Sequence, residues 1–394
     1  MISPSTLRVA VADVLDPADV HAGSGASASL LKALKEVVAE AVPLSGELPP
    51  RLGRLAHLSS VASRMRPRDL HDPRAAAKRV HGAAALGRPT IAARNRLMRR
   101  HLAAAGALDG VVQRCADMLL PVGCRIVTLE DSTVVQALEA YPWAHLQALS
   151  EREIHRYVER QRQIYEAAVA CCGATHWASE SIVKDYGIPA ERVHTVGLGQ
   201  NHELSDEPTP RDWSEPRYLF VGRRWLHKNG PVVLAAFARV RERHPKARFD
   251  VVGDHPRLDA PGVVGHGLFS LSDPGDQERL AALYRSATVF AMPSLHEAAG
   301  IVYVEAGGAG VPSIGTTNGG TATMIGDGGV VVDPLDAEQI FAAMLRLADP
   351  ETAQRMGAIA YRHSRLFTWR KVAERLIRAL AIPGLDTSGL ADYL

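Results

Sequence analysis

Short apolar runs alternate with amphipathic stretches along most of the 394 residues, and this alternation limits the fold more than any other feature. Short apolar runs bounded by loops are typical of buried strands, whereas apolar residues spaced three and four apart are typical of helices. When strands and helices alternate, each helix connects two parallel strands and covers the sheet that they form. We therefore predict an α/β fold built on parallel sheets.

The chain divides into two halves at a polar, proline-rich stretch, Asn201–Pro216, which we interpret as a linker. A chain of this length is about two to three times the usual domain size, which favours two domains. In the first half we predict strands at Leu7–Val14, Arg125–Leu129 and Val193–Gly197. We predict one helix there, at Ser27–Val42. In the second half we predict strands at Tyr218–Val221, Phe249–Val252, Val289–Met292 and Pro312–Gly315, and helices at Pro231–His244, Glu278–Ser286, Ala337–Ala348 and Trp369–Leu380.

Composition excludes several classes of protein. With 46% apolar and 22% charged residues the chain is typical of a globular protein, and no apolar run approaches the roughly 20 residues of a membrane span. The 45 Lys and Arg residues nearly balance the 43 Asp and Glu residues, so we expect no nucleic-acid partner. The start of the chain lacks the cationic residues of a signal peptide, and we expect a cytoplasmic protein.

The four cysteines form no C-x-x-C pair. Cys171 and Cys172 are adjacent in what we interpret as a helical pattern, and we expect buried, reduced thiols rather than a zinc site or disulfides.

One stretch is strongly basic. From Arg64 to Arg100 there are 11 Lys and Arg residues against Asp69 and Asp72. Such a stretch either is a solvated helical face or attracts an acidic acceptor or an anionic membrane surface.

Two glutamates stand out in Pro293–Ala306 (PSLHEAAGIVYVEA). Glu297 follows a predicted strand, a helix is expected to begin near Gly300, and Glu305 comes eight residues after Glu297. Eight residues of helix would separate the carboxylates by about 12 Å, roughly the span from a sugar across a diphosphate to a ribose. Free N–H groups at the helix start, near Ala299–Ile301, would provide an anion site between them.

A second loop, Val221–Gly230 (VGRRWLHKNG), follows another predicted strand and contains Gly222, Arg223 and Lys228. Guanidinium and ammonium groups can neutralise a diphosphate where no metal does so. The sequence has no Asp-x-Asp, H-E-x-x-H or Walker A motif, so we expect neither a metal nor a P-loop site.

Glycine loops follow two further strands. Gly319 and Gly320 precede a short predicted helix, and Gly23 and Gly25 follow the first strand of the other half. Glycines in these positions allow the backbone to approach a ligand at the carboxyl end of a strand. Together, the four loops predict one cleft between two domains.

The second half resembles the retaining, GT-B-fold glycosyltransferases of family 4, also called group 1. The resemblance rests on Gly222-Arg223…Lys228-Asn229-Gly230, on Pro293-Ser294…Glu297…Gly300…Glu305-Ala306, on Gly310-Val311-Pro312 and on Gly319-Gly320. It covers Arg217–Leu380, although Thr323 stands where many relatives have glutamate. In the first half, Thr128–Thr133, Ala174–Gly187 and Val193–Gly199 are similar to parts of the family's acceptor domain.

The resemblance implies two Rossmann-like domains that face each other across a cleft. Residues 1–205 would bind the acceptor, completed by a C-terminal helix at about 369–394, and residues 206–368 would bind the nucleotide-sugar donor.

It also implies that a sugar passes from a nucleotide-diphosphate donor to a hydroxyl, with retention and without a metal cofactor. Arg223 and Lys228 would hold the diphosphate, Glu297 the sugar and Glu305 the ribose. The backbone at Ala299, Gly300 and Ile301, with Gly23 and Gly25, would face the phosphate or sugar. Asp131 either orients the acceptor or serves as a turn or helix-cap residue.

Two alternatives remain at this point. The chain could be another GT-B enzyme, such as a nucleotide-sugar epimerase or a phosphorylase. It could also be a degenerate partner that binds a nucleotide sugar and regulates another transferase.

Overall fold

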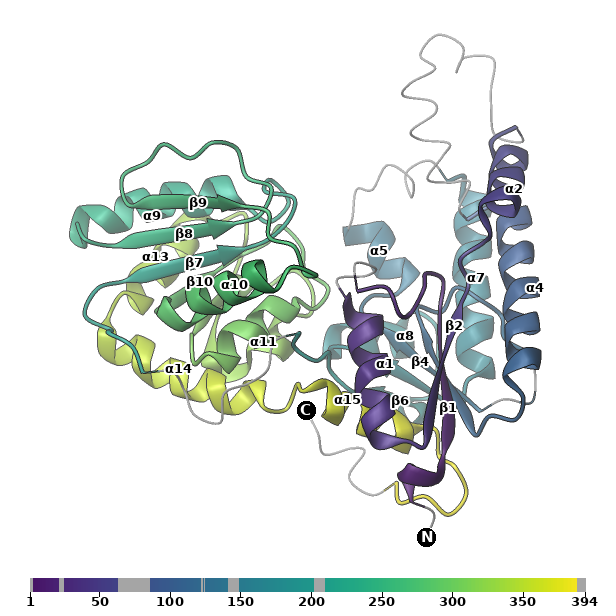
Figure 1. The fold of residues 1–394 in the computed structure, drawn as a ribbon. Helices are drawn as coiled ribbons and strands as arrows, with labels where there is room; N and C mark the ends of the chain where they lie inside the picture. Colours follow the sequence, from purple (N-terminus) through teal and green to yellow (C-terminus); the bar gives the residue numbers. More distant parts are fainter. Residues whose placement is uncertain are drawn as a thin grey trace.

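The computed structural model describes residues 3–20, 25–62, 86–121, 123, 125–140, 149–201 and 210–387. It forms two α/β units that lie side by side, each built on a six-stranded sheet (Figure 1). Every strand pair in both sheets is parallel. The predicted α/β class with parallel sheets is therefore confirmed.

The N-terminal sheet has the strand order β2-β1-β3-β4-β5-β6. Its strands are β1 (Arg8–Asp13), β2 (Glu40–Ser45), β3 (Gly110–Arg114), β4 (Ile126–Glu130), β5 (Ala170–Gly173) and β6 (Val193–Thr195). The helices of this unit are α1 (Ala26–Val37), α2 (Pro50–Ala62), α4 (Arg88–Ala105), α5 (Val134–Ala140), α7 (Glu151–Ala167) and α8 (His176–Lys184).

The C-terminal sheet has the order β12-β11-β10-β7-β8-β9. Its strands are β7 (Arg217–Val221), β8 (Arg248–Val252), β9 (Val263–Gly267), β10 (Val289–Ala291), β11 (Ser313–Thr316) and β12 (Gly329–Val332). The helices that follow these strands are α9 (Gly230–Arg243), α10 (Pro274–Ser286), α11 (Ile301–Gly308), α12 (Thr321–Ile325), α13 (Ala337–Leu347) and α14 (Pro350–Ser364).

The last described helix, α15 (Trp369–Ala379), returns to the N-terminal unit and packs against α1. One face of α15 is apolar and buried, with Val372, Leu376 and Ile377 at helical spacing. Arg125 secures its end by donating hydrogen bonds to the carbonyls of Leu380 and Ala381, at 2.8 and 2.6 Å. The N-terminal unit is thus assembled from both ends of the chain.

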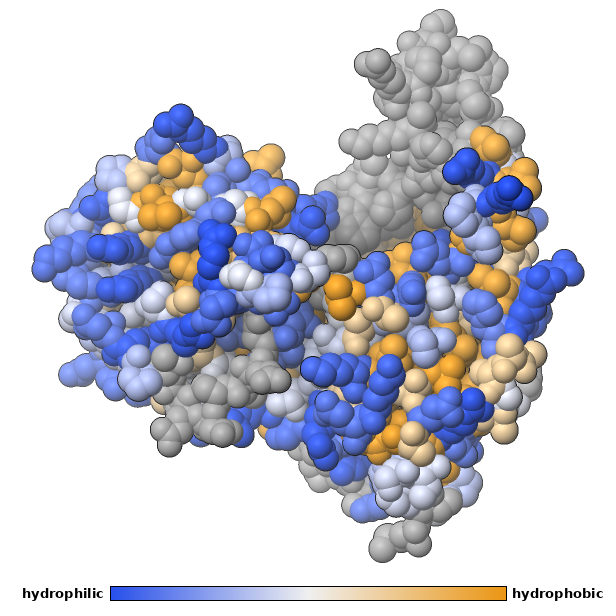
Figure 2. Space-filling view, viewed as in Figure 1, coloured by the Kyte–Doolittle hydropathy of each residue, from blue (hydrophilic) through white to orange (hydrophobic). Residues whose placement is uncertain are grey.

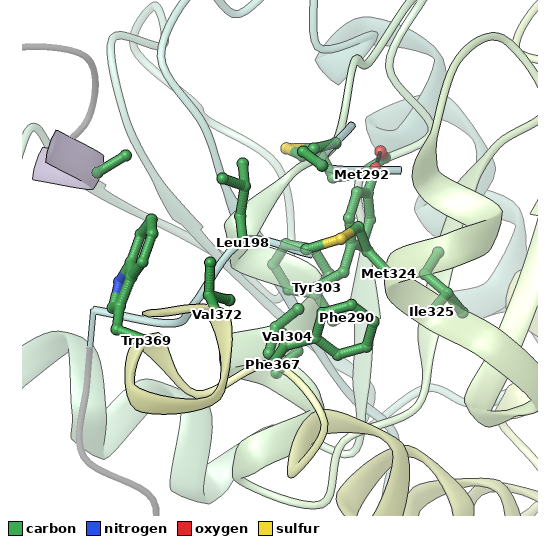
Figure 3. Packing of buried hydrophobic residues seen from close by; sticks show 14 of the residues in the cluster. Leu198, Phe290, Met292, Tyr303, Val304, Met324, Ile325, Phe367, Trp369 and Val372 are labelled. Carbon is green, nitrogen blue, oxygen red and sulfur yellow. Dashed lines mark hydrogen bonds between the residues drawn. The ribbon is translucent and has the colours of Figure 1, made fainter. Parts of the chain in front are cut away.

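A continuous core joins the two units at this crossing. Leu198 and Trp369 come from the crossing segments, and Phe367, Tyr303 and Phe290 extend the same cluster into the C-terminal unit (Figure 3). Because these side chains are buried, the connection between the units is packed rather than solvated.

Most predicted elements appear within one to three residues of the expected positions, and two interpretations are wrong. The pattern Ser27–Val42 is not one helix, because α1 ends at Val37 and the chain enters β2 at Glu40. Cys171 and Cys172 lie in strand β5 and not in a helix. A four-residue apolar run is too short for its period to distinguish strand from helix.

The domain boundary at 205/206 stays a prediction, since residues 202–209 lie outside the described residues.

Candidate active site

The loops after β7 and β10 lie next to each other although β8 and β9 separate them in sequence. Counted within this sheet the strand order is 3-2-1-4-5-6, and β7 and β10 are the neighbours at which the order reverses. Open α/β sheets bind ligands at this switch point, outside the carboxyl ends of the strands. The loops predicted to carry the donor site start from these two strands.

Lys228 and Glu297 are brought together across this position. The Lys228 ammonium donates a hydrogen bond to the Glu297 carboxylate, and the Ser294 hydroxyl donates to the same oxygen at 3.1 Å. The side chains are only 18% and 12% exposed. The sequence predicted both residues in the site but did not predict that they pair.

The loop of Glu297 is fixed by the loop after β11. Glu297 and Gly319 form a parallel bridge, in which the Glu297 N–H donates to Asn318 and the Gly320 N–H donates to the Glu297 carbonyl, at 3.0 and 2.9 Å. Gly319 has φ = +117°, and a Cβ there would lie 2.0 Å from the Glu297 carbonyl oxygen. Glycine is therefore required at 319 to hold the Glu297 backbone in place.

Helix α11 begins directly after this loop, as predicted. Gly300 is its N-cap with φ = +84°, Ala299 is buried and Ile301 is half-buried. The N–H groups of a first helical turn have no intrahelical partners, so this end of α11 is suited to an anion. Tyr303 anchors the turn by donating to the Met292 carbonyl at 2.6 Å.

Glu305 lies further along α11 and is buried. Its carboxylate accepts hydrogen bonds from the Tyr284 hydroxyl at 3.1 Å and from the Asn201 N–H at 3.4 Å. Burial, together with the nearby Glu305 carboxylate, raises the pKa of Tyr284 well above its usual value, so this phenol stays a hydrogen-bond donor. The predicted contact between Glu305 and a ribose stays a prediction.

Arg223 follows β7 and is exposed to solvent. Its neighbour Arg224 adopts φ = +65°, and the Arg224 N–H donates to the Asp254 carboxylate, which shapes the loop. Arg223 thus projects from a constrained turn near Lys228, and its predicted contact with a diphosphate stays a prediction.

The N-terminal unit contacts the same loops through the end of β5. The Thr175 hydroxyl caps α8 and also donates to the Ala298 carbonyl at 3.4 Å. The His176 N–H donates to the Thr323 hydroxyl at 3.1 Å, so Thr323 is used for contact between the units.

The ring centres of Trp177 and His296 lie 5.0 Å apart. Burial lowers the pKa of His296 to about 4, which keeps this imidazole neutral. Sequence reasoning missed Thr175 and His296, although His296 directly precedes Glu297.

Asp131 lies at the carboxyl end of β4, the neighbour of β5. The register pairs Glu130 with Gly173, so Asp131 follows one strand where Ala174 and Thr175 follow the other. The Asp131 carboxylate is half-buried and is close enough to influence Arg114 at the end of β3. Arg114 itself is buried, 3.8 Å from Asp13 of β1.

The remaining predicted glycines are Gly23 and Gly25. Gly25 is the N-cap of α1 with φ = +75°. Gly23 lies outside the described residues, as do residues 64–85 of the basic stretch.

No helix within the described ranges is long and apolar enough to cross a membrane. The same ranges contain no group of three or more His, Cys, Asp or Glu side chains arranged to hold a metal ion. Cys115, Cys171 and Cys172 are free, and burial raises the pKa of the Cys171 thiol to about 12.

Comparison with known proteins identifies the C-terminal unit. Residues 215–349 match the family model described as "Glycosyl transferases group 1". A D-inositol 3-phosphate glycosyltransferase from Corynebacterium diphtheriae is 30% identical over 251 residues, which is 57% of this chain and 58% of the relative. One from Xylanimonas cellulosilytica is also 30% identical over 251 residues, or 56% and 58% of the two chains. The match thus spans well under two thirds of these curated relatives.

Solved structures share the fold over nearly the whole chain. Sucrose-phosphate synthase from Thermosynechococcus elongatus has a TM-score of 0.64 at 18% identity, covering 94% of this chain and 98% of that one. A UDP-forming trehalose-phosphate synthase from Burkholderia xenovorans also has a TM-score of 0.64, at 14% identity and 97% and 100% coverage.

A third solved structure, of Staphylococcus aureus TarM, contains UDP and α-GlcNAc-glycerol. It has a TM-score of 0.52 at 10% identity and covers 73% of this chain and 59% of that one. Residues 215–349 thus match the group 1 glycosyltransferase family, and with its two parallel six-stranded sheets the chain has the GT-B fold of these solved structures.

Proposed function

We propose that this chain is a retaining glycosyltransferase that moves a sugar from a nucleotide-diphosphate donor, UDP- or GDP-linked, to an acceptor hydroxyl without a metal ion. The observation that carries the proposal is the pairing of Lys228 with Glu297 at the start of α11. It places a cation, a carboxylate and a helix N-terminus at one switch point. A cytoplasmic location belongs to the same proposal.

The cationic side would stabilise the leaving group. An ammonium has three N–H donors, so Lys228 can keep its bond to Glu297 and still donate to a phosphate oxygen. Arg223 and the first N–H groups of α11 would add to this charge stabilisation, which is the largest catalytic contribution in many enzymes. UDP is present in the structure of TarM, which shares the fold, and this supports a nucleotide-diphosphate donor.

The carboxylates would hold hydroxyl groups. Glu297 would accept from hydroxyls of the transferred sugar, while Glu305 would accept from the ribose and keep Tyr284 as a second partner. As the sugar–phosphate bond breaks, the departing phosphate would take the acceptor's proton on the same face, which gives retention.

The acceptor would bind at the carboxyl edge of the N-terminal sheet. Asp131 would orient its hydroxyl, since it lies beside β5 and β5 contacts the donor loop. Gly23 and Gly25 would let the backbone approach the donor from this side. The names of the curated relatives support a hydroxylated acceptor.

Binding of UDP, GDP, ADP and dTDP, measured as a thermal shift in the presence of EDTA, tests the donor site. A nucleotide at 100 times its dissociation constant stabilises the folded chain by about 2.7 kcal/mol. We expect one nucleotide to stabilise the wild type and Lys246→Ala, an exposed control, but to stabilise Lys228→Ala much less.

Turnover with the matching nucleotide sugar should fall by about 10²–10³-fold in Lys228→Ala, as when one charge-stabilising donor is removed. Equal responses of the two lysine variants would overturn the assignment of the diphosphate site. Conversion of the sugar without an acceptor would identify an epimerase. Binding without either reaction would identify a regulatory partner.

A further inference from the structure

Arginines line two adjoining cavities at the N-terminal ends of α4 and α7. The larger cavity is about 650 Å³ and the smaller is about 340 Å³. Arg88 and Arg156 line both, Arg152 lines the larger, and Arg160 lines the smaller. We call these four side chains and the space between them the arginine groove.

The acids of the described ranges leave three of the four arginines in the groove unpaired, whereas Arg160 is attracted by the nearby Asp117 carboxylate. Arg88, Arg152 and Arg156 are exposed, and in the described ranges none of them has a carboxylate at ion-pair distance. The Arg156 guanidinium donates only to the Arg152 carbonyl, at 3.0 Å.

Two acidic residues are in the walls of the cavities. Glu153 lines the smaller cavity and caps the start of α7, where its carboxylate accepts hydrogen bonds from the N–H and hydroxyl of Ser150 at 3.0 and 2.8 Å. Glu151 lines the larger cavity, where three arginines (Arg88, Arg152 and Arg156) outnumber this one carboxylate.

The backbone adds to this field. Helix α4 starts after Gly87, a buried residue with no side chain to cap the helix, and Gly87 and Arg88 both line the smaller cavity. The positive end of the helix dipole at this start favours an anion. Burial lowers the pKa of Arg160 against the attraction of Asp117, and its guanidinium lies 4.9 Å from the centre of the Tyr157 ring. A bound anion would further stabilise its charge.

The groove adjoins the edge where the acceptor is expected. Tyr157 lines the smaller cavity, and its hydroxyl donates to Asp117 at 2.9 Å. Asp117 follows the carboxyl end of β3, and Asp131 follows the end of the neighbouring strand β4. One ligand could therefore place a hydroxyl near Asp131 and an anionic group toward the arginines.

We infer that the arginine groove binds a phosphoryl group carried by the acceptor. This inference rests on the proposed function and names the acceptor as a phosphorylated one. Planar guanidinium groups match phosphate oxygens with paired hydrogen bonds, and three of them without acidic partners suit a dianion better than a carboxylate.

The phosphoryl group could belong to a soluble phosphomonoester or to a lipid headgroup. Helix α2 borders the smaller cavity through Ser59 and exposes Leu55 and Leu58, 68% and 62% accessible. In Figure 2 hydrophobic and hydrophilic residues are mixed around this end of the molecule. The experiment therefore compares both sources.

The test uses the double variant Arg152→Glu/Arg156→Glu. Its control, Arg99→Glu/Arg100→Glu, makes the same charge change on α4 about 16 Å along the helix from Arg88. Calorimetric titration with inorganic phosphate and D-inositol 3-phosphate measures the soluble source. Sedimentation with phosphatidylcholine vesicles, with and without phosphatidic acid, measures the lipid source.

We expect one of the two phosphate sources to bind wild type and control equally and to bind the groove variant at least ~10-fold more weakly. Loss of soluble-ligand binding identifies a phosphomonoester acceptor, and loss of vesicle binding alone identifies a lipid-linked one. The inference is overturned if no phosphate probe binds the wild type, or if both variants bind alike. Nucleotide stabilisation, measured on the same samples, reports on the donor site separately, so failure of the inference differs from failure of the proposed function.

Discussion

Replacement of Gly319 by alanine should damage the site through the backbone alone. At φ = +117° an alanine is strained, which costs about 1–3 kcal/mol. Its Cβ would also lie 2.0 Å from the Glu297 carbonyl oxygen, so the two loops must separate by about 1.4 Å or more to reach an ordinary contact.

That separation strains two hydrogen bonds between the loops, from Gly320 to Glu297 at 2.9 Å and from Glu297 to Asn318 at 3.0 Å. Each is worth about 1 kcal/mol. We therefore expect Gly319→Ala to lower the free energy of unfolding by about 3–5 kcal/mol.

Gly267→Ala is the matched control. Gly267 has φ = +72°, and a Cβ there would meet no atom within 4 Å, so the substitution introduces only the local strain of about 1–2 kcal/mol. Urea unfolding followed by circular dichroism compares the two variants with the wild type. Nucleotide stabilisation should also weaken in Gly319→Ala, because the Glu297 loop moves.

If the two variants unfold at the same urea concentration, the contact between Gly319 and Glu297 does not hold the loop, and the reasoning is wrong.

Two further changes test the packing around the site. The pKa of His296 is about 6.5 in the unfolded chain and about 4 in the folded one, so between these pH values the unfolded chain binds more protons. The free energy of unfolding should therefore drop by roughly 2–3 kcal/mol as the pH falls from 6.5 to 4. His296→Asn should flatten this loss in pH-dependent unfolding curves, although His227 and His194, whose pKa values are also lowered by burial, still contribute. An unchanged curve would contradict the assignment. Arg375 is 1% exposed and donates to the Val196 carbonyl at 2.7 Å, so Arg375→Ala should cost about 2–4 kcal/mol in denaturant unfolding. Arg370→Ala, on the exposed side of the same helix and paired only with Glu374 within it, should cost less than about 0.5 kcal/mol, and similar losses for both would refute the buried role.

Strands β7 and β10 are among the elements that the sequence predicts most clearly. In β7 and β10 continuous apolar runs leave little ambiguity, and both appear where expected. Burial alone did not ensure a prediction, because the buried strand β3 was not predicted and β5 was interpreted as helix. Two edge strands, β2 and β9, were missed for physical reasons. Strand β2 contains Pro43, which only an edge tolerates, and β9 is half-exposed and contains two glycines, so neither shows a strand's usual pattern.

The residues of the candidate site also differ in how far the sequence predicts them. Lys228, Glu297 and the start of α11 follow from local motifs, because strand ends and helix starts are written in adjacent residues. The contacts of Thr175 with Ala298 and of Trp177 with His296 join residues more than 100 positions apart. No local pattern records such pairs, since they depend on how the two units dock.

The return of α15 to the N-terminal unit has a mechanical consequence. The chain crosses between the units twice, and the crossings touch, because the Gln200 N–H donates to the Phe367 carbonyl at 3.1 Å and the Trp369 indole donates to Asn201 at 3.4 Å. Two covalent connections at one place act as a single hinge line. We therefore expect the units to rotate about that line rather than slide, which would move the loops after β7 and β10 toward or away from the N-terminal strand ends.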